Sequence, residues 1–131
     1  MNSERMSLPL YIPVAAATAG TASDLFCANR SGGKAKVVAV DFVADGAVTA
    51  NDTNYATFTA SVGGTSIGTV STTTTDSGNI ADGGVASVAL SGAGSNLVAD
   101  GGAVKVAITK PGTGVAIAGT VQVTLERVRA D

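Results

Sequence analysis

Hydrophobic residues in this 131-residue chain recur at every second position, in short runs that end at glycine-rich segments. Residues 56–62 alternate apolar and hydroxyl-bearing side chains, and the same period of two recurs at 104–108 and 121–125. Such alternation places one set of side chains on each face of a β-strand. No window keeps apolar residues at helical spacing without interruption by Gly or a β-branched residue. The chain is therefore predicted to be all-β.

Turn signals divide the chain into short strands. Residues 36–44 are apolar on both faces, which is typical of a central strand, and Gly63-Gly64 marks a hairpin. The polar segment 72–82 is predicted to be a loop. The predicted strands cover residues 8–14, 24–29, 36–44, 55–62, 65–71, 86–90, 104–108 and 121–125.

Strands of this number and length predict a β-sandwich or a small barrel, and we favour the former. The fold class is an antiparallel β-sandwich, jelly-roll-like, with an extended N-terminal arm. At this length the chain fits one domain. Residues 1–17 are the arm or a first strand, and residues 18–131 are a single β-sandwich domain.

A Val/Ile-Ala-Asp-Gly sequence occurs at residues 43–46, 80–83 and 98–101. The Asp side chain can bond within its own turn, and Gly tolerates a positive φ. The three copies indicate either a diverged repeat or repeated use of one turn type. Their spacing is irregular, so a solenoid or propeller is not expected.

The chain lacks the residues that most catalytic and metal sites need. It has no His and one cysteine, Cys27, which excludes Ser/His/Asp and Cys/His sets and an intrachain disulfide. Cys27 has apolar neighbours and is predicted to be a buried, inert thiol. The loop aspartates do not form a calcium-binding ladder closed by Glu, and no phosphate-binding glycine motif occurs. We expect no enzymatic activity, no metal and no cofactor.

Charged residues are few and unevenly placed. They make up 14% of the chain, whereas an average globular protein has about 25%. Between Lys36 and Lys105 every charged residue is Asp, so neighbouring terminal strands would create a basic side and an acidic side. That arrangement suits docking on a complementary partner or head-to-tail contact between copies, or it is only a solvated surface. The net charge of −2 argues against a nucleic-acid partner, and no apolar stretch is long enough for a membrane helix.

Two segments are candidate contact surfaces. Residues 53–75 carry no charge, although exposed strands normally carry charges that block edge pairing. Part of this segment is therefore expected at an interface between subunits. Near the N-terminus, Leu8, Leu10, Tyr11 and Ile12 are candidate anchors of an arm that lies over a neighbouring subunit, or they belong to an ordinary first strand.

Short motifs between residues 34 and 128 resemble the small β-sandwich head decoration (cement) proteins of tailed bacteriophages. They are Thr-Asn-Tyr-Ala-Thr-Phe-Thr at 53–59, Thr-Lys-Pro-Gly-Thr-Gly at 109–114, and Ala-Gly-Thr at 118–120 before a Val-rich closing strand. Within the first motif, Tyr55, Thr57 and Thr59 are further candidate interface residues.

The resemblance implies a structural virion protein on the outer capsid surface, made in the host cytoplasm. It implies a subunit, often a homotrimer, that binds between major capsid protein subunits and stabilises the capsid. The alternative is a tail, fibre or adhesin β-domain that binds a receptor or glycan. Such sites usually present exposed aromatic residues on loops, whereas the aromatic residues here lie at strand-like positions, which favours the decoration role.

Overall fold

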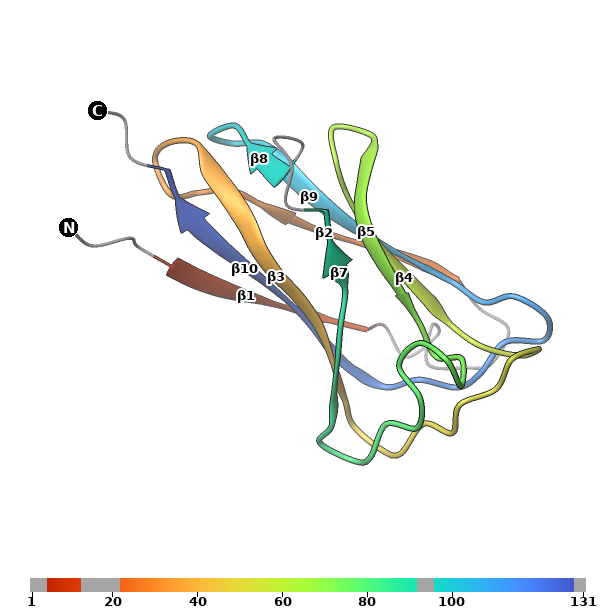
Figure 1. Ribbon diagram of the computed structural model, residues 1–131. Helices are drawn as coiled ribbons and strands as arrows, with labels where there is room; N and C mark the ends of the chain where they lie inside the picture. Colours follow the sequence, from red (N-terminus) through yellow and green to blue (C-terminus); the bar gives the residue numbers. More distant parts are fainter. Residues whose placement is uncertain (1–4, 13–21, 92–95, 129–131) are drawn as a thin grey trace.

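The computed structural model describes residues 5–12, 22–91 and 96–128 (Figure 1). Its elements are all β-strands, and they form two antiparallel sheets that pack face to face. The predicted antiparallel β-sandwich is confirmed. The strands are β1 (Arg5–Tyr11), β2 (Ser23–Ala28), β3 (Ala35–Ala44), β4 (Thr57–Val62), β5 (Thr65–Ser71), β6 (Val85–Ser87), β7 (Ala89–Leu90), β8 (Leu97–Val98), β9 (Ala103–Thr109) and β10 (Gly119–Arg127).

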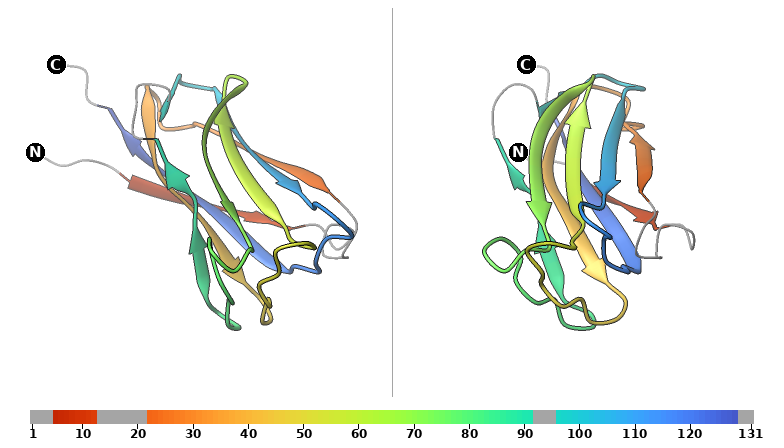
Figure 2. Two further views of the ribbon diagram at one scale, coloured as in Figure 1. Left: turned by 45° about the vertical axis from the view of Figure 1, so that its right-hand side comes forward. Right: turned by 90° about the vertical axis from the view of Figure 1, so that its right-hand side faces the viewer.

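The strand order is that of a jelly roll. Sheet A has the order β1-β10-β3-β6, with β8 also paired to β3, and sheet B has the order β2-β9-β4-β5-β7. Along the chain each strand lies in the other sheet from the one before it, except that β4 and β5 form a hairpin within sheet B. Repeated crossing between two sheets is what defines the jelly-roll sandwich. The two layers are seen from two sides in Figure 2.

The core lies between the sheets and is built mainly from Val, Ile and Ala. Buried and partly exposed residues alternate along β10 and along most of β3, so each strand presents one face to the core. Phe42 of β3 and Phe58 of β4 stack across the interior, with ring centroids 4.7 Å apart and an angle of 22° between the rings. Because β3 lies in sheet A and β4 in sheet B, this pair joins the two layers.

Residues 5–11 form β1, an edge strand of sheet A. It pairs with β10 residue by residue, from Arg5 opposite Glu126 to Tyr11 opposite Thr120. This pairing continues through residues 5–7, so the strand begins before the predicted start at residue 8. The Arg5 Nε atom also donates to Glu126 Oε2 at 2.7 Å. Residues 1–4 and 13–17 of the predicted arm lie outside the described residues.

The segment 85–90 passes from one sheet to the other. Its first part, β6, pairs with β3 in sheet A, and its second part, β7, pairs with β5 in sheet B. Between them the Val88 N–H donates to the Val40 carbonyl at 2.8 Å. The sequence predicts one strand here, and the structure divides it because the segment changes sheets. The short strand β8 was not predicted, since two residues carry no detectable alternation.

Two of the three Asp-Gly turns share the same hydrogen bonds. In residues 80–84 and 98–102, the N–H of the fifth residue donates to the carbonyl of the second, at 2.7 and 2.8 Å. A residue from another segment holds each turn: Ala44 holds the first and Asn29 the second. In both cases the N–H and the carbonyl of that residue form hydrogen bonds with the turn. The turn at 43–46 is built differently, because its Gly N–H donates to a side chain of the 80–84 turn.

Candidate interaction surfaces

The N-terminal candidate anchors point to opposite faces of β1. Leu8 and Leu10 are half-buried and pack against the core, and Ile12 is part of the core. Their apolar side chains pack inside this domain, as expected for the alternative of an ordinary first strand, and their role as anchors on a neighbour stays a prediction. Tyr11 points outward, and 74% of its surface is exposed. It is the one exposed member of the set.

Tyr11 stands beside a shallow groove of about 560 Å³. The groove lies at one end of sheet A, where β10 begins and the Asp45-Gly46 and Asp82-Gly83 turns meet. The Asp82 carboxylate accepts the Gly46 N–H at 2.9 Å, which fixes the two turns against each other. The sequence marked these aspartates as turn residues, and only the fold places them next to an exposed tyrosine.

Thr57 and Thr59 lie on the outer surface of sheet B. The Thr57 and Ser71 hydroxyls are 2.8 Å apart and share a hydrogen bond, and the Thr69 hydroxyl donates to the Phe58 carbonyl at 3.1 Å. We call this surface the hydroxyl face. Its outward-facing residues on β4 and β5 are uncharged: Thr57, Thr59, Ser61, Ser66, Thr69 and Ser71. On β9 the face continues over Ala107 and Thr109, and Lys105, opposite Ser61, marks its charged border.

An exposed aromatic side chain borders the hydroxyl face. Phe26 of the edge strand β2 is 60% exposed and lies opposite Lys105 of β9. The Lys105 Nζ atom is 3.6 Å from Asp24 Oδ2, so the charges nearest to Phe26 are paired with each other. Sequence reasoning missed Phe26, although burial of its neighbour Leu25 and the period of two would have placed it outward.

Tyr55 lies apart from the hydroxyl face. It precedes β4 in a loop, and its N–H donates to the Pro111 carbonyl at 3.4 Å. Next to it, the Asn54 Oδ1 atom accepts the Thr113 N–H at 2.9 Å. These bonds tie the loop before β4 to the loop after β9, so Tyr55 is a half-buried part of a loop cluster.

Aspartates hold other loops at the same end. Asp52 accepts the Thr74 N–H at 2.8 Å and the Thr74 hydroxyl at 2.8 and 2.9 Å. These donors lower the pKa of Asp52 because they stabilise its charged form. Asp76 likewise accepts the Ser71 N–H at 2.8 Å. Both carboxylates are therefore used to hold loop residues in place, and Asp52 joins two segments that are 22 residues apart in the chain.

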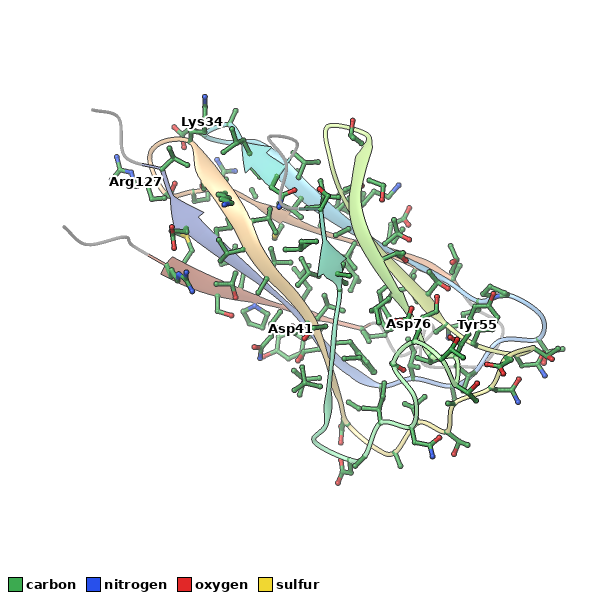
Figure 3. All side chains as sticks on the ribbon, viewed as in Figure 1. Lys34, Asp41, Tyr55, Asp76 and Arg127 are labelled. Atoms are coloured by element: carbon green, nitrogen blue, oxygen red, sulfur yellow. The ribbon has the colours of Figure 1, made fainter. Side chains whose placement is uncertain are left out.

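Charges separate along the length of the sandwich. Lys34 and Arg127 lie at one end, Asp76 lies toward the other, and Asp41 lies between them (Figure 3). In the described residues the first end holds Arg5, Arg30, Lys34, Lys36 and Arg127 with Glu126 and Asp100, and the second holds Asp45, Asp52, Asp76 and Asp82 with Lys110. The first end is therefore mainly basic and the second mainly acidic.

Cys27 of β2 is half-buried, and burial raises the pKa of its thiol, while a hydrogen bond with the Val104 backbone opposes that shift. The thiolate is the nucleophilic form. We therefore expect Cys27 to react with a disulfide reagent such as DTNB about tenfold more slowly at pH 7 than free cysteine does. Measuring the reaction in urea is the control, because the unfolded chain should react at the free rate.

The same shift gives the free energy of unfolding a pH dependence. The unfolded chain loses the thiol proton first, so stability should fall as the pH rises through the usual range for a thiol. A Cys27→Ser variant should lack this part of the alkaline decline. Equal DTNB rates in native and unfolded protein would contradict the assignment.

Within the described ranges, no group of three or more Cys, Asp or Glu residues is placed to hold a metal ion. In the same ranges no helix is long and apolar enough to cross a membrane. Comparison with protein-family models, with curated proteins and with solved structures finds no match to this chain. The class of protein is therefore given by the fold, which is an antiparallel β-sandwich with jelly-roll strand order.

Proposed function

We propose that this chain is a structural virion protein that decorates a phage capsid and stabilises it by binding between major capsid protein subunits. The observation that carries the proposal is the hydroxyl face, whose outward-facing residues on β4 and β5 are all uncharged and which Lys105 of β9 borders. The central parts of protein interfaces are depleted in charged residues. A surface of this composition suits contact with another protein more than a permanently solvated role.

The hydrogen bonds on the hydroxyl face favour burial under a partner. Covering a polar group is costly when its hydrogen bonds are left unmade. On this face the hydroxyls of Thr57 and Ser71 bond to each other, and that of Thr69 bonds to a backbone carbonyl. A partner that covers these three hydroxyls therefore leaves fewer hydrogen bonds unmade than it would over hydroxyls with no partner in the domain. Phe26 at the border supplies an exposed ring of the kind that often anchors an interface.

The charged ends support an oriented attachment. Complementary potentials steer partners and fix their relative orientation. A basic end and an acidic end on one small domain give it a preferred direction on a capsid surface. We propose a homotrimer on the outer capsid surface, made in the host cytoplasm, with adhesion as its mechanism. In this proposal the protein is not an enzyme and needs no cofactor, nucleic acid or membrane.

The test is the native mass of the purified protein, alone and after mixing with capsids that lack it. We expect a trimer that co-sediments with the capsids and raises their melting temperature, because a ligand that binds only the assembled state stabilises it. A monomer that neither sediments with capsids nor changes their melting temperature would contradict the proposal.

Variants locate the contact surface. A Thr57→Lys/Thr59→Lys double variant puts two charges on the hydroxyl face and should weaken capsid binding at least about tenfold. Thr124→Lys is the matched control, since Thr124 is half-exposed on the outer surface of β10 in sheet A. Its binding should match that of the unmodified protein. If the double variant binds normally while its urea midpoint is unchanged, the contact lies elsewhere.

A further inference from the structure

The groove beside Tyr11 is open to solvent, and its lining combines an aromatic ring with two carboxylates. Its volume of about 560 Å³ falls within the range of about 300–1,000 Å³ typical of such sites. It is formed where the end of β1, the start of β10 and two Asp-Gly turns meet. This end of sheet A is separate from the hydroxyl face of sheet B.

Several of the residues that line the groove are small. Ala44, Gly83, Ala118 and Gly119 all line it. Gly119 has φ +134°, and a Cβ at this position would collide with the Val43 carbonyl oxygen. The backbones of β10 and β3 therefore approach too closely at Gly119 for a side chain.

The polar groups at the rim are hydrogen-bond acceptors. Asp45 and Asp82 are among the lining residues, and Asp82 is held in place by the Gly46 N–H. Thr120, which pairs with Tyr11 across β1 and β10, adds a hydroxyl. The Tyr11 ring is exposed at the end of its strand and provides an apolar platform. A fitting ligand has an apolar face for the ring and several hydroxyl donors for the carboxylates.

From this combination we propose that the groove binds neutral saccharides, with a sugar ring stacked on Tyr11 and its hydroxyls donating to Asp45 and Asp82. Pyranose rings have an apolar C–H face and a hydroxyl edge, which match the two kinds of group in the groove. Acidic sugars are disfavoured, because two carboxylates repel a third. The site does not depend on the capsid proposal, since it uses different residues on another surface.

The test is a titration of the ¹⁵N-labelled protein, followed by amide chemical shifts, with maltotriose, cellotriose, triacetylchitotriose and lactose. At least one of these probes should produce saturable shifts that centre on Gly83, Gly119 and Thr120. The acidic probe 3′-sialyllactose should bind more weakly than lactose. Saturable binding of none of the four neutral probes, or stronger binding of the acidic probe, would overturn the proposal.

Substitutions of Tyr11 test whether its ring is the surface on which the sugar stacks. Tyr11→Ala should weaken binding about tenfold or more, and Tyr11→Phe should retain most of it because the ring remains. Phe26→Ala is the matched control, since it removes the other strongly exposed aromatic ring among the described residues. If Tyr11→Ala binds as tightly as the unmodified protein, or if Phe26→Ala is the variant that loses binding, the groove is not the site. Urea midpoints of the variants check that each one is folded.

Discussion

Replacing Phe58 by Ala is expected to lower the free energy of unfolding by about 3–5 kcal/mol. The ring is 1% exposed and stacks on Phe42 at a centroid distance of 4.7 Å. The substitution removes apolar contacts and leaves a cavity that the surrounding aliphatic side chains can fill only in part. With no tryptophan and five Phe and Tyr residues in the whole chain, little else can replace this contact between the sheets.

Equilibrium unfolding in urea, followed by circular dichroism, measures this change. A domain of this kind has a total stability of about 5–15 kcal/mol, so the variant should lose a large fraction of it. Phe26→Ala is the control, because Phe26 is 60% exposed and its removal should change stability by about 0.5 kcal/mol or less. Similar losses for the two variants would show that the Phe42–Phe58 pair is not central to the core.

A Gly119→Ala substitution should cost about 3 kcal/mol, although it adds only one methyl group. Gly119 adopts φ +134°, a conformation that other residues avoid, and the added Cβ would meet the Val43 carbonyl oxygen and the Asp45 nitrogen. Both of these are backbone atoms of β3 and its turn, so they cannot rotate away. The first residues of β10 would have to separate from β3, where Gly119 pairs with Ala44.

Gly33→Ala is the matched control for this prediction. Gly33 does not have a positive φ, and an added Cβ there would make only ordinary contact with the flexible Arg127 side chain. Its effect on the urea midpoint should be small or slightly stabilising, because Ala restricts the unfolded chain. A Gly119→Ala variant as stable as the Gly33→Ala variant would show that the β10 backbone can move away from β3 at little cost.

The strands that the sequence predicted best are those that combine alternation with a turn signal. The predicted range 65–71 coincides with β5, and 36–44 differs from β3 by one residue. Gly63 and Gly64 both have positive φ in the hairpin before β5, as the glycine pair indicated. Local patterns succeeded here because hairpin geometry and strand period are set by neighbouring residues.

The surfaces were less predictable from sequence. Alternation showed that Leu8, Leu10 and Ile12 share a face, but not that β10 would turn that face toward the domain's own core. The same limit applies to Asp45 and Asp82, which are distant in sequence and meet only because β3 and β6 pair. Phe26 could have been placed outward, but its distance from other exposed rings depends on which strands are neighbours.

The sequence by itself therefore determined an all-β sandwich with short strands, glycine turns and no histidine or disulfide chemistry. These follow from residue type and local period, which do not depend on distant contacts. Tertiary structure alone decided the jelly-roll strand order, which strands lie side by side in the hydroxyl face, which charges lie at each end and the groove at Tyr11. Each of these depends on pairing between residues far apart in the chain, and pairing is selected by how the two sheets bury their apolar faces together.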